Sequence, residues 1–238
     1  METVWQKAPE NLNLSDDALH VWHLPMQLDP EFVVANWALL NEHELARAKR
    51  FYFEKDRQKY ALAHGGMRCV LARYLDCHPK EMTFTFNEHN KPGLQDQQVQ
   101  FNLSHTDDVA VLAVTRSCLV GVDIEKIDDK RANLDIAKRF FSTREYEQLR
   151  GLPDDKFARG FFNVWTRKEA FVKAIGLGLS YSLDQFSVSL EDDNAKLTEL
   201  MKMPEALDEW HMGCFSPAEG VLGAWACLGD IKHVEYFC

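Results

Sequence analysis

The order of the predicted elements constrains the fold of this chain more than any single residue does. A strand over 19–26 is followed by helices and then by strands over 82–86, 99–103 and 109–114. The second half runs similarly, with a strand over 119–125, a helix over 157–175, and strands over 186–190, 209–215 and 221–227. Each half therefore reads as strand, helix and three strands, which predicts an α+β protein with two similar lobes.

Each lobe is expected to be a small, largely antiparallel sheet packed against a long helix. The boundary is placed near residues 115–118, so that residues 1–116 form the N-terminal lobe and residues 117–238 the C-terminal lobe. A binding site would lie between the lobes, because ligand sites commonly form at such interfaces.

Composition narrows the function classes. The net charge of −10 argues against non-specific nucleic-acid binding. The six cysteines form no C-x-x-C pair, so a structural zinc site is not expected. No signal peptide and no apolar run of membrane-spanning length is found, which predicts a protein of the cytoplasm with free thiols and no membrane partner.

Two acids occupy the strand over 121–125. On a strand, Asp123 and Glu125 project from the same face with their Cα atoms ~7 Å apart, while Val122 and Ile124 point into the core. A strand end that meets solvent explains such a pair as well as a metal site does, because exposed acids are common.

A third acid lies on the helix over 157–175. Glu169 and Lys173 are four residues apart and share a face, which is also the pattern of an ordinary exposed ion pair. The neighbouring aromatic residues indicate a buried helix instead: Phe161, Phe162, Trp165 and Phe171. Charged groups on a buried helix usually have a partner or a function.

Ser104 and His105 end the strand over 99–103 and could bind a phosphate, although a structural turn explains them equally well. A Ser–His hydrolase is disfavoured, because adjacent strand side chains point apart and no G-x-S-x-G elbow is present. Taken singly, Lys91, Arg47 and Lys59 are ordinary surface charges.

Together and in this order, the motifs N-K-P-G, F-N-L-S-H, G-V-D-I-E and W-T-R-K-E-A-F-V-K resemble those of the 4′-phosphopantetheinyl transferases. The similarity is closest to the Sfp-type branch, whose members are single chains of two lobes related by a pseudo-twofold axis. It includes R-F-Y at residues 50–52 and the segment 136–149, and it spans roughly residues 47–190.

The resemblance implies an enzyme, a holo-[acyl-carrier-protein] synthase, that moves phosphopantetheine from coenzyme A to a serine of an apo acyl or peptidyl carrier protein. The other product is 3′,5′-ADP. It implies that Asp123, Glu125 and Glu169 bind Mg²⁺, that Glu169 is the general base, and that Lys173 stabilises phosphoryl oxygens.

In the N-terminal lobe, the resemblance implies contacts to coenzyme A from Arg47, Lys59, Lys91, Ser104 and His105. Glu44 stands where some members have a lysine, so part of that contact is expected to shift to Arg47 or Arg50. Lys168 is expected to face phosphate or solvent.

Two alternatives stay open: a silent coenzyme A or nucleotide-binding module with this fold, and a metal-dependent phosphohydrolase. The carrier is expected to be acidic and to dock on a basic or apolar patch, with Phe140–Phe141 as one candidate. Two lobes in one chain make a monomer sufficient.

Overall fold

The computed structural model describes residues 3–95 and 98–238. The elements of the first half are β1 (Ala18–Leu24), α1 (Pro30–Leu39), α2 (Glu42–Ala48), α3 (Glu54–Leu75), β2 (Phe84–Phe86), β3 (Pro92–Leu94), β4 (Gln100–Thr106) and β5 (Val109–Thr115). Those of the second half are β6 (Leu119–Lys126), α4 (Leu134–Phe140), α5 (Thr143–Arg150), α6 (Asp154–Ile175), β7 (Phe186–Val188), β8 (Leu197–Leu200), β9 (Trp210–Ala218), β10 (Val221–Leu228) and β11 (His233–Phe237). Short 3-10 turns lie at Pro79–Glu81, Gly178–Ser180, Leu183–Gln185 and Pro204–Glu209. The predicted α+β class is confirmed.

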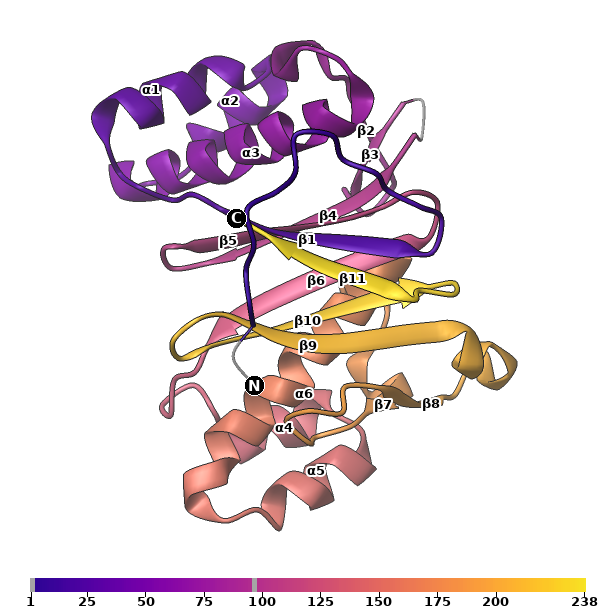
Figure 1. Cartoon of the computed structure of the whole chain (residues 1–238). Helices are drawn as coiled ribbons and strands as arrows, with labels where there is room; N and C mark the ends of the chain where they lie inside the picture. The colour runs from indigo at the N-terminus through magenta and orange to yellow at the C-terminus, as the bar shows by residue number, and fades with distance from the viewer. Residues whose placement is uncertain (1–2, 96–97) are drawn as a thin grey trace.

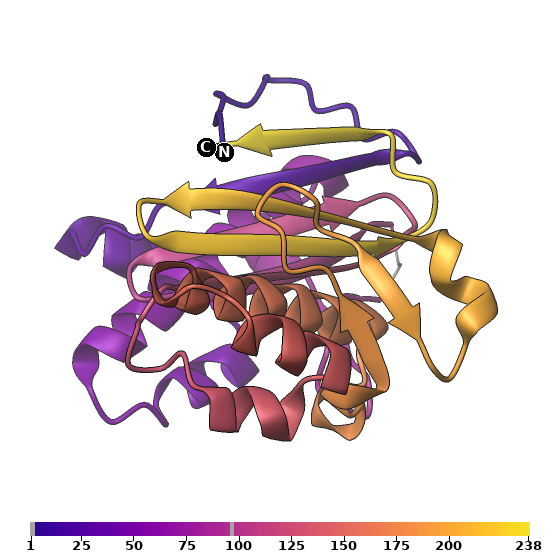
Figure 2. The same cartoon turned by 90° about the horizontal axis from the view of Figure 1, so that it is seen from below.

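The elements stack as helices, sheet, sheet and helices (Figure 1). The first sheet has the strand order β11-β1-β5-β4, and the second has the order β6-β10-β9. Helices α1–α3 cover the outer side of the first sheet, and α4–α6 cover the outer side of the second (Figures 1 and 2). The pairs β2-β3 and β7-β8 form separate two-stranded sheets.

Three apolar cores hold these layers together. One lies between α3 and the first sheet, and another lies between α6 and the second sheet. The core between the two sheets contains Val21 and Val111 from the first sheet, and Val122, Ile124 and Trp225 from the second. Val122 and Ile124 are thus buried as predicted, which turns the alternate residues of β6 toward α6.

The two long helices, α3 and α6, each contain 22 residues. The α3 helix packs closely on α1 at Gly65, where a Cβ would lie only 2.9 Å from the Asn36 Cα. The adjacent Gly66 has ordinary space around it, with its nearest neighbour atom at 3.6 Å. Gly176 ends α6 in the left-handed conformation (φ 70°), as the sequence predicts for the C-terminus of this helix.

Several parts of the chain differ from the sequence prediction, and the short strands β3 and β8 were not predicted. The charged segment over 42–59 forms α2 and the first turns of α3, since Asn41 and Glu44 make a capping box at the start of α2. The strand β11 was not predicted. It pairs in parallel with β1, so residues beyond 117 also build the first sheet, and the division at 116/117 remains a proposal.

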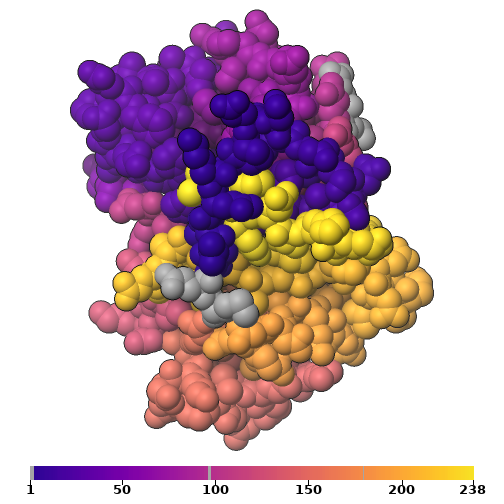
Figure 3. Space-filling model, viewed as in Figure 1, coloured from indigo at the N-terminus to yellow at the C-terminus, as the bar shows by residue number. Residues whose placement is uncertain are grey.

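The N-terminal segment crosses β11 on one face of the molecule (Figure 3). The backbone of Gln6 donates to Tyr236 O at 3.0 Å and accepts from Cys238 N at 3.0 Å. All six cysteines are free. Within residues 3–95 and 98–238, no helix combines the length and apolarity needed to span a membrane.

Candidate active site

The backbones of β6 and α6 touch at Gly121. A Cβ built at this position would overlap the Ala170 carbonyl oxygen and the Ala174 nitrogen, so only a residue without a side chain fits. The strand therefore lies directly on the helix. Because strand side chains alternate, Asp123 and Glu125 project from this same face toward α6.

Asp123 is the centre of a buried polar cluster. Its Oδ1 accepts hydrogen bonds from Lys173 Nζ at 2.6 Å and from Ser104 Oγ at 3.1 Å. Lys173 Nζ also donates to Ser104 Oγ at 3.0 Å, which ties β4, β6 and α6 together. The other oxygen, Asp123 Oδ2, is buried and has no hydrogen-bond partner in the part of the chain that the structure describes.

The other two acids lie beside Asp123. Glu125 accepts from Arg131 at 3.1 and 3.4 Å, and burial raises its pKa, with a further contribution from the negative charge of Asp123. Burial also raises the pKa of Glu169, and the charge of Asp123 adds to this shift. Glu125 raises the pKa of Glu169 as well, as expected for carboxyl groups that lie in one small region.

The donor set of this region fits Mg²⁺, although no three acidic, histidine or cysteine side chains among the described residues form a ready-made metal site. Magnesium prefers oxygen ligands, takes one or two carboxylates, and keeps several positions for water and substrate phosphates. The unpartnered Oδ2 of Asp123 is an acceptor of this kind, with Glu125 and Glu169 beside it.

A pocket of about 680 Å³ opens next to these acids and is lined by residues from both halves of the chain. This volume lies in the usual range for a small-molecule site. Glu169 and Lys173 line one part of the pocket. The remaining wall includes cationic and aromatic side chains from both lobes, among them His43, Arg47, Tyr60, His64, Phe84, His105, Phe140, Trp165 and Tyr181.

Arg47 and His105, two of the predicted contacts to coenzyme A, both line the pocket. The His105 ring is exposed within the pocket, yet enough protein surrounds it to lower its pKa, helped by the positive charges of His64 and Lys173. Ser104 belongs to the acid cluster rather than to the pocket wall. Lys59 is held by Asp108 at 2.9 Å and is not among the lining residues.

Two predicted cationic groups are held by the protein itself. Lys91 lines the pocket, but its Nζ donates to Ala174 O at 2.8 Å and to Val120 O at 3.1 Å. Lys168 faces neither phosphate nor solvent, so that expectation is wrong. It is fully buried and pairs with Glu145 at 2.8 Å, because its side of α6 packs on α5 and β7.

Comparisons with known proteins identify the family. Residues 26–117 match the family described as "4'-phosphopantetheinyl transferase, N-terminal", and residues 119–226 match the "4'-phosphopantetheinyl transferase superfamily". The chain is 34% identical to "4'-phosphopantetheinyl transferase HetI" of a Nostoc species, over 96% of this chain and 95% of that protein. The chain belongs to the 4′-phosphopantetheinyl transferase superfamily.

This transferase is also 34% identical to "4'-phosphopantetheinyl transferase Sfp" of Bacillus subtilis, over 68% of this chain and 72% of the relative. Among solved structures, the holo-[acyl-carrier-protein] synthase of Thermotoga maritima matches with a TM-score of 0.36 and 19% identity, covering 48% of this chain and 66% of that one. The family match and the two transferase relatives show that the protein is an enzyme of the phosphopantetheinyl transferase class, as predicted.

Sequence reasoning missed part of the transferase pocket. Tyr60 and His64 stack with their ring centroids 3.9 Å apart, and both line the pocket. Glu44, which stands where other members have a lysine, is buried and pairs with Arg68 at 2.8 Å. Tyr60 and His64 are four residues apart on one helix face, so the sequence could have predicted their contact. The pairing of Glu44 could not be predicted in this way, because its partner Arg68 lies 24 residues away.

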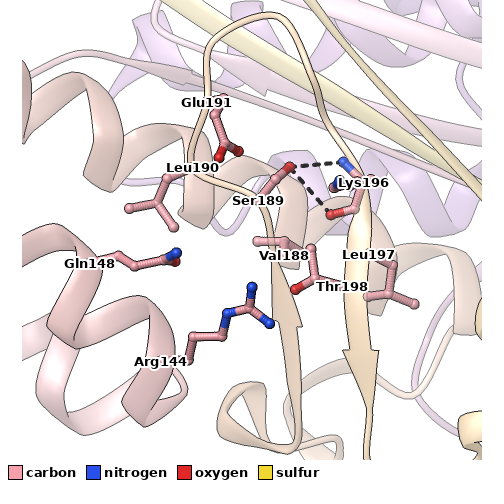
Figure 4. A pocket seen from close by; sticks show the side chains of 9 residues that line it. All are labelled: Arg144, Gln148, Val188, Ser189, Leu190, Glu191, Lys196, Leu197 and Thr198. Atoms are coloured by element: carbon pink, nitrogen blue, oxygen red, sulfur yellow. Dashed lines mark hydrogen bonds between the residues drawn. The ribbon is translucent and has the colours of Figure 1, made fainter.

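A second hollow, of about 380 Å³, lies between α5 and the β7-β8 pair of the transferase (Figure 4). Arg144 and Gln148 extend into it from α5, while Ser189 on the opposite side bonds the backbone of Lys196 (Figure 4). None of the predicted site residues lines this hollow, so the chemistry is assigned to the larger pocket.

Proposed function

We propose that this enzyme transfers the 4′-phosphopantetheine group of coenzyme A to a serine hydroxyl of an apo acyl or peptidyl carrier protein, with Mg²⁺ as cofactor. One observation carries the proposal. Asp123, Glu169 and Lys173 converge beside a pocket whose other wall presents Arg47, His64 and His105. An acidic cluster next to a cationic pocket suits a ligand with several phosphates and a metal ion.

In the reaction, the serine oxygen attacks the phosphorus atom that carries pantetheine, and the bond from this phosphorus to the oxygen of the leaving nucleotide breaks. The products are the phosphopantetheinyl carrier and 3′,5′-ADP. Glu169 lines the pocket and would take the proton of the serine hydroxyl. Lys173 would donate its remaining N–H group to a phosphoryl oxygen.

Asp123 holds Lys173 in place and, with Glu125 and Glu169, would bind the metal ion. When bound, Mg²⁺ would neutralise charge on the pyrophosphate. Arg47 and His105, which line the pocket, would contact the nucleotide phosphates. The contacts of Lys59 and Ser104 to coenzyme A are further predictions to test. We further propose that the enzyme works in the cytoplasm as a monomer.

The experiment is to incubate the protein with coenzyme A, Mg²⁺ and several apo carriers, and to measure the mass of each carrier. The expected result is a mass increase of one phosphopantetheine on at least one carrier, and no increase on the same carrier with its serine replaced by alanine. EDTA should stop transfer, and added Mg²⁺ should restore it. Phosphate release from coenzyme A without a carrier would support the phosphohydrolase instead.

A further inference from the structure

Lys91 links three segments that meet beside the acid cluster. The residue belongs to the turn between β2 and β3, and its Nζ bonds Ala174 O of α6 and Val120 O of β6. Ala174 follows Lys173, and Val120 precedes Gly121, the residue at which β6 touches α6. The ammonium group therefore lies at the junction of the strand that carries Asp123 and the helix that carries Lys173.

Asn87 fixes the same turn to the same helix end. Its Nδ2 donates to Gly176 O at 2.8 Å, while its Oδ1 accepts from the backbone nitrogens of His89 at 2.9 Å and Lys91 at 2.8 Å. A Cβ at Gly176 would lie 2.9 Å from the Lys91 Cδ, so the turn and the helix end are in close contact. The turn thus presents Lys91 in a defined position.

The electrostatics favour this arrangement. The C-terminal carbonyl groups of a helix carry partial negative charge, and a cation placed there stabilises the helix end. Lys91 is half-buried, and burial lowers its pKa to about 8. Its two bonds to backbone carbonyl oxygens link the segments that surround it.

We propose that Lys91 is a positioning residue for phosphopantetheinyl transfer. It acts through α6 and β6, by fixing Lys173 and Glu169 relative to Asp123, rather than by binding a phosphate of coenzyme A. The inference rests on the proposed function for its kinetic part. Its structural part, the link between the turn and the helix end, is independent of the reaction.

The test compares Lys91→Met with the wild type and with Lys80→Met, which removes an exposed lysine of the same lobe. Each protein is assayed with coenzyme A and with 3′-dephospho-coenzyme A. We expect Lys91→Met to lower kcat about tenfold or more with both substrates. We expect KM to change by less than about threefold, because substrate binding is retained. Lys80→Met should match the wild type.

Two kinetic outcomes would overturn the proposal. One is a rise in KM for coenzyme A but not for 3′-dephospho-coenzyme A, with kcat unchanged, which marks a phosphate ligand. The other is a Lys91→Met enzyme with wild-type kcat and KM. If the wild type itself transfers nothing, it is the proposed function that fails.

Hydrogen exchange provides the readout that does not need the reaction. Lys91→Met should exchange the backbone amides of residues 170–176 and 119–123 faster than the wild type, and unchanged exchange there would contradict the link. Should Lys91→Met not fold, Asn87→Ala replaces it, since this change removes the bond to Gly176 O and the two bonds that hold the turn, while the Lys91 side chain stays in place. It should lower kcat in the same direction and by a smaller factor.

Discussion

Lys168 and Lys173 lie on the same helix but have different roles. Five residues along an α-helix correspond to a rotation of about 140°, so the two side chains point to different surroundings. Lys168 points into the core, where it bonds Glu145 and the carbonyl oxygens of Leu183 and Phe186. Lys173 points to the pocket and bonds Asp123. The first is therefore a structural residue and the second a candidate catalytic one.

Asp123→Asn should abolish most of the transfer activity while the protein stays folded. The amide keeps the volume of the side chain but removes the charge that holds Lys173 and that would bind Mg²⁺. A loss of at least about 100-fold in kcat is expected, because both an electrostatic and a metal contact are affected. Transfer to a carrier is measured by mass, and folding by circular dichroism.

The matched control is Asp129→Asn, since Asp129 is an exposed acid on the loop that follows β6. It should transfer at the wild-type rate. Full activity of Asp123→Asn would show that this carboxylate is not part of the metal site.

Lys168→Met should destabilise the protein strongly, because it leaves the Glu145 carboxylate buried without its partner. Removal of one member of a buried pair typically costs about 3–5 kcal/mol. The double variant Glu145→Gln with Lys168→Met should recover part of this loss. Chemical denaturation of the wild type, Glu145→Gln, Lys168→Met and the double variant measures the coupling. Equal stability of Lys168→Met and wild type would show that the pair is dispensable.

At the residue scale, the resemblance to a family selected Asp123, Glu125 and Glu169 as metal ligands, because spacing alone explained a solvent-facing strand end or a surface ion pair equally well. It was not enough to distinguish a lysine that contacts the pocket from one that contacts the protein. The partners of Lys91 are 29 and 83 residues away, and the partner of Lys168 lies on another helix. Such contacts depend on the packing of elements, which the local pattern does not contain.

At the scale of elements, the contact between β6 and α6 determines the geometry of the site. Gly121 has no side chain between the strand and the helix, so Asp123 of β6 and Lys173 of α6 come within bonding distance. Close packing on α6 thus explains the glycine of the G-V-D-I-E motif, and the proposed metal site explains its two acids. The packing contact and the proposed ligands lie within the same five residues.

Gly121→Ala should therefore reduce both stability and activity. The added methyl group would overlap backbone atoms of Ala170 and Ala174, which cannot move aside as a flexible side chain would. Overpacking of this kind costs typically about 1–3 kcal/mol and would push β6 away from α6. Thermal unfolding and the transfer rate are measured together.

Gly66→Ala is the control for this substitution. Gly66 lies inside α3 with ordinary space around it, and alanine is about 1 kcal/mol more favourable than glycine in a helix interior. This variant should be as stable as the wild type or more so. A Gly121→Ala protein of wild-type stability and activity would contradict the close packing.

The elements themselves were largely predictable, because their signals are local. Pro30 at the start of α1, the capping box of Ser142 and Glu145 at α5, and Gly176 after α6 all mark helix ends in the sequence. The strand β11 was not predicted, because it has only five residues and its partner β1 lies far away in the sequence. Its alternation alone could not reveal a parallel pairing over that distance.

At the scale of the whole molecule, acid should destabilise the fold through its buried histidines. Burial lowers the pKa of His20 and His64 below the ordinary value of 6.5. Near pH 6.5 these histidines are therefore protonated in the unfolded chain but still neutral in the folded protein. The free energy of unfolding consequently falls as the pH drops below about 6.5. The pKa values of Glu125 and Glu169 are raised above the ordinary value of 4.5. As the pH falls towards 4.5, these two groups bind protons more readily in the folded protein than in the unfolded chain, which opposes the trend.

The denaturation midpoint should therefore fall between pH 7.5 and pH 5.5, and His20→Gln should show a smaller fall than the wild type. His20 is suited to this test, since it is only 1% exposed and lies between Tyr74 at 2.8 Å and Glu235 at 3.0 Å. Identical pH profiles for the two proteins would exclude a contribution from this residue.

The parallel pairing of β11 with β1 has a consequence for synthesis. A ribosome that has made the helices and strands of the first half has still to translate residues 233–237 before the first sheet has its edge strand. Until then, Trp22 lacks the ring of Phe237, which lies 4.9 Å away in the finished protein. The first sheet is thus completed only after all the strands of the second sheet have been made.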